Sequence, residues 1–233
     1  MLELEPQILL TDKPLKATSF DVVAVIRNSL TKELGLKVKV SHTGTLDPLA
    51  TGVLAILVGQ ATKAQDLFLK KDKEYLFTLQ LGAQTETGDK EGEVIKTVPV
   101  PSLNEVQIHQ ILTQFIGHQQ QTVPLFSAVQ VNGKRLYKYA RANKSPGPLP
   151  VKRIEIFNLK LISFNKSKNE LKLRVKCSAG TYVRSLAEDI AKELKTVGHV
   201  TRLRRIASGE FFIKDCTKIR LQNTNLFGRI SEK

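Results

Sequence analysis

The stretch His42-Thr43-Gly44-Thr45-Leu46-Asp47-Pro48-Leu49-Ala50-Thr51-Gly52 comes directly before an apolar run at residues 53–58. It places one carboxylate, Asp47, among two glycines, one proline and three threonines. These residue types favour a shaped loop, because proline fixes a dihedral angle, glycine permits tight turns and hydroxyls cap free backbone groups. The apolar run predicts a buried strand after this loop. Since an aspartate before proline is most often a plain turn residue, the loop alone leaves both a turn role and a catalytic role open for Asp47.

The charge of the chain points to a polyanionic partner. Its 233 residues carry a formal net charge of +14 and a pI of about 9.8, and 41% of them are apolar. This length allows one large domain or two small ones with a real hydrophobic core. A positive surplus of this size favours nucleic acid as a partner, through neutralisation of phosphates and release of counterions. A basic protein without such a partner is the alternative interpretation.

The cysteines and the N-terminus indicate where the protein works. Cys177 and Cys216 provide neither the spacing of a metal site nor a disulfide framework. A reducing cytosol fits this usage best. The N-terminus is acidic and its apolar length is too short for a signal peptide, and no apolar run reaches membrane-spanning length. We therefore expect a cytoplasmic protein with no bound metal and no membrane association.

Hydrophobic periodicity predicts more strands than helices. Expected strands lie at 8–10, 53–58, 75–81, 126–131, 154–164 and 171–177, with short strand pieces within 200–213. Helices are expected after a cap at Ser19, through 63–69, after a capping box of Ser102 and Glu105, and at 182–194. The acidic segment 86–92 is expected to be a solvated hairpin connection. Hairpin signals outnumber regular βαβ alternation, which indicates an α+β fold with a mixed, mostly antiparallel sheet.

Five blocks of the chain, in order, resemble the TruB family of tRNA pseudouridine synthases. The Asp47 loop resembles the catalytic motif of that family. The other blocks are Lys13-Pro14 with Thr18-Ser19-Phe20-Asp21, Phe126-Ser127-Ala128 with 132–137 and Ala140-Arg141, the segment 174–187, and the segment 199–205. Five blocks in family order make a chance match very improbable.

The resemblance implies a fold, a reaction and a substrate. The fold is that of the pseudouridine synthases, with helices and loops around a catalytic cleft. The expected reaction isomerises uridine 55 in the T loop of tRNA to pseudouridine, after the base is flipped out and its glycosidic bond is broken and re-formed. This isomerisation needs no group donor and no redox change, so no cofactor and no metal are expected. The expected partner is the T-arm stem-loop of tRNA, bound by a monomer without a guide RNA or an obligate protein partner.

Asp47 is the expected catalytic residue, and Arg184 is expected to keep it ionised. An arginine in the first turn of a helix opposes the helix dipole, so it usually has an anion nearby. In the family, the arginine of the Gly-Thr-Tyr-x-Arg string pairs with the catalytic aspartate. The alternative is that Glu188, one turn further along, forms a simple surface bridge with Arg184.

The remaining expected site residues bind RNA. Tyr75 and Tyr182 are expected to contact the flipped base, with Leu203 beside it, although core packing explains Tyr75 and Leu203 almost as well. His42 is expected to occupy the space that the base leaves, as a binding rather than an acid–base residue. Candidate phosphate contacts complete the set: Lys63, Arg141, Arg202, Arg204 and Arg205.

We expect a catalytic domain at residues 1–213, a short tail at 214–233 and no separate PUA-type domain. Two other functions stay open. One is that of the RNA-guided relative, which modifies ribosomal RNA within a protein–RNA particle. The other is an RNA-binding or RNA-folding module whose chemistry is incidental.

Overall fold

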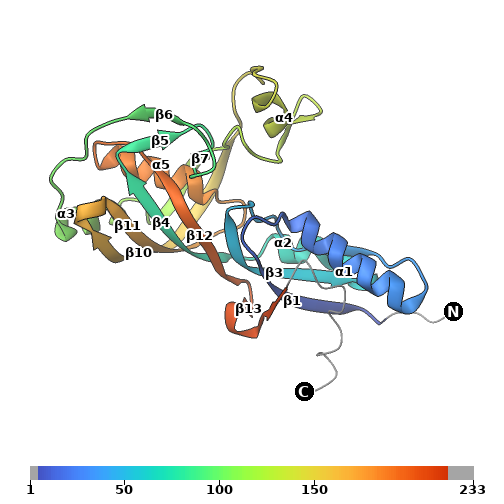
Figure 1. Cartoon of the computed structure of the whole chain (residues 1–233). Helices are drawn as coiled ribbons and strands as arrows, with labels where there is room; N and C mark the ends of the chain where they lie inside the picture. The colour runs from blue at the N-terminus through green and yellow to red at the C-terminus, as the bar shows by residue number, and fades with distance from the viewer. Residues whose placement is uncertain (1–4, 220–233) are drawn as a thin grey trace. The chain divides into compact units, whose positions relative to one another are not determined.

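The computed structural model describes residues 5–219, which form two compact units (Figure 1). The first unit contains residues up to Tyr75 together with residues from Arg204 onward. The second unit contains residues 76–203. Strands β4 and β12 contribute residues to both units.

The first unit is built around strand β3. Its elements are β1 (Gln7–Lys13), α1 (Ser19–Leu34), β2 (Val40–His42), β3 (Ala50–Val58), η1 (Gly59–Ala64), α2 (Gln65–Leu69), β13 (Phe211–Phe212), η3 (Ile213–Asp215), β14 (Thr217–Lys218) and parts of β4 (Lys73–Leu81) and β12 (Gly198–Ser208). The strand order is β14-β1-β3-β12, with β2 paired to β3 and β13 paired to β12. Strand β1 is antiparallel to β3 and parallel to β14. Residues 53–58 are all fully buried, as expected for a continuous apolar run in a central strand.

The second unit is a sheet of longer strands with α5 against one side (Figure 1). Its elements are β5 (Ala83–Thr85), β6 (Val94–Thr97), α3 (Glu105–Thr113), β7 (Gly117–Thr122), β8 (Gln130–Val131), β9 (Lys134–Arg135), α4 (Leu136–Ala140), β10 (Val151–Asn165), η2 (Lys166–Lys168), β11 (Glu170–Cys177), α5 (Val183–Glu193) and the other parts of β4 and β12. The strand order is β12-β4-β11-β10-β7. Strand β10 is antiparallel to β11 and to β7.

Alternation along β4 and β11 produces the core of the second unit. Every second residue of each strand is buried. Helix α5 buries the stripe expected from its periodicity, including Leu186 and Ile190. The chain is therefore an α+β protein with a mixed, mostly antiparallel sheet, which confirms the predicted fold class.

The structure places both helix caps one or two residues away from the predicted positions. Helix α1 is capped by Thr18, whose side chain forms a capping box with Asp21, and not by Ser19. Helix α3 is capped by Asn104 with Gln107, and not by Ser102 with Glu105. In each case a second residue that can also cap lies one or two positions away, and local sequence does not distinguish the two.

Three other elements differ from the prediction. The segment 200–213 is mainly one long strand, β12, rather than short pieces. The predicted helix at 63–69 is a 3₁₀ turn followed by the short α2. The predicted strand at 126–131 is limited to β8, which pairs with β9 across the expected Asn132-Gly133 turn.

The predicted tail at 214–233 lies partly outside the described residues, from Arg220 onward. Its first part forms η3 and β14, and β14 pairs with β1 through Thr11↔Thr217 and Asp12↔Lys218. Within residues 5–219, none of the helices has the length and apolar character needed to cross a membrane.

Candidate active site

Asp47 lies half-buried in the loop that connects β2 to β3. Its neighbours Leu46 and Leu49 are buried and anchor the loop on both sides of it. The Asp47 carbonyl accepts a hydrogen bond from the Ala50 amide at 2.9 Å, which closes a turn into β3. The loop is therefore a fixed support for one carboxylate, as its sequence predicts.

The N-terminal block holds the loop on both sides of Asp47. The Ser19 hydroxyl accepts from the Leu46 amide at 2.8 Å and contacts the Leu46 carbonyl at 3.3 Å. The ammonium of Lys13, which has no exposed surface, donates to Ala17 O at 2.6 Å and lies 3.5 Å from Pro48 O. These bonds explain why the Lys13 and Ser19 block accompanies the Asp47 motif in the sequence.

Arg205 is a buried support of the same loop rather than a phosphate contact. Its side chain is 1% exposed and donates to Val53 O at 2.7 Å and Gly44 O at 3.1 Å. At Gly52, where φ is +107°, an added Cβ would lie 2.1 Å from the Arg205 carbonyl oxygen. Only glycine allows β12 to approach the chain this closely. The prediction that Arg205 binds phosphate is therefore wrong, because its donors are used inside the protein.

Two further candidate phosphate contacts on β12 have different surroundings. Arg204 forms a two-pronged ion pair with Asp12, at 2.7 and 3.1 Å, and also donates to Thr51. Arg202 is exposed.

His42 ends β2 with its ring half-buried. Its Nδ1 atom accepts from the Gly44 amide at 3.2 Å, and its carbonyl accepts from Gln65 Nε2 at 2.9 Å. Burial, and then the positive charge of Arg205, lower the pKa of His42 below its usual value of 6.5. A neutral imidazole at physiological pH suits the binding role expected for His42.

Two other predicted residues of the first unit differ in exposure. Tyr75 is buried on the same face of β4 as Phe77 and Leu79. Lys63 is exposed on η1. Their roles toward RNA stay predictions.

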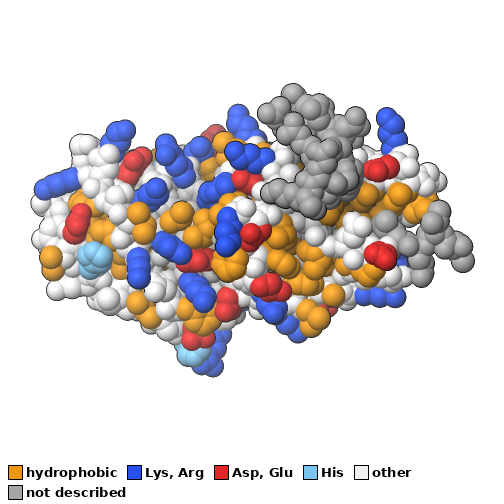
Figure 2. Space-filling view, turned by 90° about the horizontal axis from the view of Figure 1, so that it is seen from below, with side chains coloured by type: hydrophobic (Ala, Val, Ile, Leu, Met, Phe, Trp, Pro, Cys, Tyr) orange, Lys and Arg blue, Asp and Glu red, His pale blue; other side chains and the backbone are white. Residues whose placement is uncertain are grey.

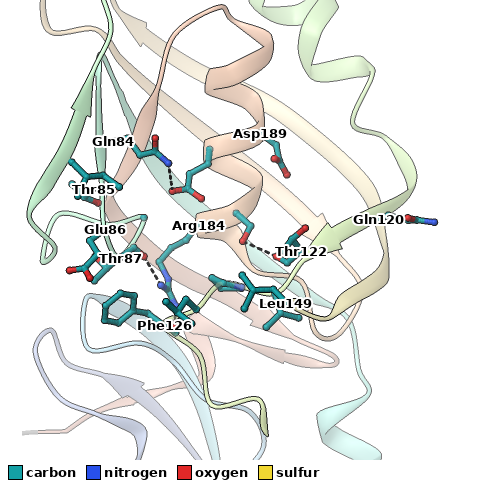
Figure 3. A pocket seen from close by; sticks show the side chains of 17 residues that line it. Gln84, Thr85, Glu86, Thr87, Gln120, Thr122, Phe126, Leu149, Arg184 and Asp189 are labelled. Atoms are coloured by element: carbon teal, nitrogen blue, oxygen red, sulfur yellow. Dashed lines mark hydrogen bonds between the residues drawn. The ribbon is translucent and has the colours of Figure 1, made fainter. Parts of the chain in front are cut away.

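Arg184 is in the first turn of α5 and is 5% exposed. Its guanidinium donates to Thr87 O at 2.6 Å (Figure 3) and to Phe126 O at 2.9 Å. Its Nε lies 3.8 Å from an oxygen of Asp89. Because Arg184 is buried, its ion pair with Asp89 is not a surface bridge of the kind considered for Glu188. The guanidinium is instead held in one orientation by two carbonyls and a carboxylate.

Asp89 is a site residue that sequence reasoning missed. The segment 86–92 was expected to be solvated, but Asp89 is 5% exposed. Its carboxylate accepts from the Thr87 hydroxyl at 2.7 Å and from the Glu91 amide at 3.0 Å. The one available signal was indirect: a buried arginine at a helix start needs an anion.

The other predicted residues of the second unit lie on separate elements. Tyr182 caps α5 half-buried, and its backbone exchanges two hydrogen bonds with the Gln121 side chain, at 2.7 and 3.1 Å. Leu203 is buried on β12. Arg141 is exposed at the end of α4, with its guanidinium 5.5 Å from the centre of the Tyr137 ring.

A pocket of about 330 Å³ lies beside Arg184 within the second unit (Figure 3). The side chains of Glu188 and Asp189 on α5 line it, together with Gln84, Thr122 and Leu149. Glu188 is half-buried, and burial raises its pKa, whereas Asp189 is exposed. Within residues 5–219 no group of three or more His, Cys, Asp or Glu side chains is arranged to hold a metal ion.

The predicted site residues thus divide between the units. The first unit holds Asp47, His42, Tyr75 and Lys63, and the second holds Tyr182, Arg184, Leu203 and Arg141. Within the first unit, the structure connects the Asp47 loop to His42 and Arg205. Within the second, it connects Arg184 to Thr87, Asp89 and Phe126.

Two solved structures contain a chain with a similar fold. This protein matches a chain in a crystal structure of a Cbf5-Nop10-Gar1 complex, with a TM-score of 0.67 and 28% identity over 91% of this chain and 52% of that one. It also matches one in the structure of an H/ACA RNP bound to a substrate RNA containing 2'-deoxyuridine, with a TM-score of 0.64 and 25% identity over 91% of this chain and 50% of that one.

Curated relatives match at higher identity. The tRNA pseudouridine synthase B of Phocaeicola vulgatus is 44% identical over 92% of this chain and 91% of its own length. That of Psychrobacter cryohalolentis is 43% identical over 89% of this chain, and this chain spans 57% of its length.

Two family models match adjacent segments of the chain. Residues 31–183 match the N-terminal domain of the TruB family pseudouridylate synthases. Residues 184–226 match the C-terminal domain of tRNA pseudouridylate synthase B. Taken with the Asp47 loop and the buried arginine of α5, these matches show that the chain belongs to the TruB family of pseudouridylate synthases.

Proposed function

We propose that this protein is a tRNA pseudouridine synthase that converts uridine 55 in the T loop to pseudouridine. The observation that carries the proposal is the Asp47 loop, in which hydrogen bonds join the residues around one half-buried aspartate to Ser19, Lys13 and Arg205. The relatives named tRNA pseudouridine synthase B support tRNA as the substrate class. We place this activity in the cytoplasm.

The reaction rearranges bonds within one nucleotide. The bond from N1 of uracil to C1' of the ribose breaks, the base turns, and a bond from C5 to C1' forms. The proton on C5 is lost and N1 gains one, so atoms and electrons balance without a cofactor. Asp47 supplies the negative charge that this exchange requires, as a nucleophile or as a stabiliser of developing positive charge.

Arg184 is proposed to hold Asp47 ionised and oriented. A buried guanidinium keeps a neighbouring carboxylate charged, because it favours the anionic form. The bonds from Arg184 to Thr87 O, Phe126 O and Asp89 fix the guanidinium before substrate arrives, which reduces the reorganisation needed in the reaction. Replacing Arg184 by Lys keeps the charge but loses the fork of donors, and we expect turnover to fall about 100-fold or more.

The base and its surroundings are proposed to be held by the other predicted residues. Tyr75 and Tyr182 contact the flipped uracil, Leu203 packs beside it, and neutral His42 fills the space that the base leaves. Lys63 and Arg141, both exposed, are proposed to contact phosphates of the T arm. We propose that the protein works as a monomer.

The test is direct mapping of pseudouridine in an unmodified tRNA transcript incubated with the purified protein. We expect modification confined to position 55. Asp47→Asn should abolish single-turnover modification, whereas Asp66→Asn, at an exposed carboxylate of α2 in the same unit, should leave it unchanged. Modification by Asp47→Asn at the wild-type rate would remove Asp47 from the chemistry.

A second candidate function follows from the solved structures, which are H/ACA complexes that include other proteins. In that case the chain would need a guide RNA or protein partners to select its uridine. Modification of bare tRNA by the purified chain alone would exclude this candidate. Modification that occurs only after a guide RNA is added would favour it.

A further inference from the structure

Positive charge is concentrated in the hairpin formed by β10, η2 and β11. Residues 151–177 contain eight Lys or Arg against two Glu, a net charge of +6 out of +14 for the whole chain. A segment of 27 residues therefore carries close to half of the net charge of a 233-residue protein. This concentration distinguishes the hairpin from an evenly charged solvated surface.

The strand period places part of this charge on one face. Along β11, the apolar residues Leu171, Leu173, Val175 and Cys177 are buried, and the intervening Lys172, Arg174 and Lys176 are exposed. Residues two apart on a strand lie about 6.6 Å apart, so these three cations form a row about 13 Å long. On β10, exposed Lys160 lies directly opposite Arg174 in the antiparallel register. We call Lys160, Lys172, Arg174 and Lys176 the basic face.

The basic face brings like charges close together. Like charges directly opposite each other on an antiparallel pair repel. Lys160 and Arg174 are directly opposite, and Lys172 and Lys176 flank Arg174 on the same face. The cross-strand partners of Lys172 and Lys176 are the neutral Ser163 and Asn158. A polyanion lying over the face would turn this repulsion into attraction.

The basic face lies on the side of the sheet opposite α5. A Cβ added to Gly198 would lie 2.7 Å from Leu79 Cδ1 and 3.0 Å from Ala191 Cβ, so α5 packs on the face of β4 that carries Leu79. Figure 1 shows α5 against one side of this sheet, and Figure 2 shows Lys and Arg side chains spread over the face of the molecule that is seen from below. Arg184 lies in the first turn of α5, and Tyr182 is its N-cap residue. An RNA that is bound at Arg184 and Tyr182 can therefore contact the basic face only through another part of the same molecule.

We propose that the basic face binds the phosphate backbone of the tRNA substrate outside the T-arm stem-loop. This inference rests on the proposed function, since it assigns a second contact surface to the same substrate. Lysines and arginines that bind backbone phosphate supply affinity without reading sequence. The basic face thus strengthens binding of whole tRNA, and the chemistry stays at Asp47.

The experiment compares two triple variants with equal loss of charge. Lys160→Gln, Lys172→Gln and Lys176→Gln remove charge from the basic face. The matched control combines Lys32→Gln, Lys37→Gln and Lys39→Gln, three exposed lysines of the first unit. Each protein is titrated with full-length tRNA transcript and with an isolated T-arm stem-loop at several salt concentrations, and thermal melting by circular dichroism confirms folding.

Each lost phosphate contact lowers the slope of log affinity against log salt by about 0.7 to 0.9. For the basic-face variant, we expect the magnitude of this slope to fall by about two on full-length tRNA and to stay unchanged on the stem-loop. For the control variant, we expect the slope to change by less than about one on either RNA. Equal losses for the two variants, or equal losses on the two RNAs, would overturn the proposal. The wild-type protein could fail to modify tRNA while the basic-face variant still loses more affinity for full-length tRNA than the control variant does. In that case the proposed function fails and the assignment of the basic face stands.

Discussion

At the scale of single residues, buried cations shape the loop of Asp47. Lys13 and Arg205 are 0% and 1% exposed, and both donate to backbone carbonyls in or beside that loop. Burying a charge is costly unless hydrogen bonds compensate for lost hydration. The charges are thus tied to the loop geometry, because displacing the loop would leave them without these acceptors.

Arg205→Met is expected to lower the free energy of unfolding by about 3 kcal/mol, because Val53 O and Gly44 O lose a charged donor. It is also expected to slow single-turnover modification far more than it weakens tRNA binding, because the Asp47 loop loses a support. Urea unfolding and rapid-quench assays measure the two effects. The control Thr11→Val removes one buried bond to Leu54 O at 2.6 Å in the same unit and should leave turnover unchanged. Equal slowing in both variants would show that stability alone limits the rate.

Glu188→Gln is expected to stabilise the protein at neutral pH. Burial raises the pKa of Glu188 above its usual 4.5, so the folded state binds this proton more tightly than the unfolded state. The contribution of Glu188 to stability is therefore full below about pH 4.5 and is lost as pH rises through the folded-state pKa.

Glutamine cannot ionise and can still accept from Gln84. The melting temperature of Glu188→Gln should accordingly exceed that of wild type at pH 7, and the two should converge near pH 4. A higher melting temperature for wild type than for Glu188→Gln at pH 7 would contradict the view that ionised Glu188 destabilises the folded protein.

At the scale of elements, the start of α1 connects helix formation to the Asp47 loop. Thr18 caps α1 through its bond with the Asp21 amide at 3.0 Å, and the next residue, Ser19, binds Leu46. Helix α3 carries the same kind of capping box at Asn104 and Gln107. The two helices therefore form a matched pair, one attached to the candidate site and one in the second unit.

Thr18→Ala and Asn104→Ala are each expected to destabilise the protein by about 1 kcal/mol, the usual cost of losing an N-cap. Only Thr18→Ala should also slow modification, because fraying at the start of α1 displaces Ser19. Chemical denaturation and single-turnover assays at a temperature where both variants are folded separate the effects. If only Asn104→Ala slowed modification, the cap of α3 rather than the cap of α1 would support the candidate site.

At the scale of the whole molecule, net charge governs association with RNA. The charge of +14 gives a long-range attraction for any polyanion. We expect affinity for tRNA to fall about 100-fold between 50 and 200 mM salt, as for a protein that neutralises several phosphates. Filter binding across a salt series measures this change. An affinity that does not respond to salt would show that the surplus charge does not contact RNA.

The sequence alone determined the elements with strong local periodicity. Alternation along β4 and β11 and the apolar stripe of α5 predict their structure and buried faces, since each pattern is repeated over several residues. The same holds for the Asp47 loop, where proline, glycines and a following apolar run act over a short stretch of chain. The family resemblance then indicated which carboxylate matters.

Only the tertiary structure decided where the polar groups of the candidate site find their partners. In the sequence, Arg205 resembles the other cations of a basic segment. In the structure it is buried, and its guanidinium donates to the carbonyls of Val53 and Gly44, which are far away in sequence. The sequence predicts that Asp89 is a solvated turn residue, but in the structure it is buried beside Arg184. Backbone carbonyls are present at every residue, so no sequence pattern marks the ones that accept a buried charge. The partners are set by the folding of distant segments against one another.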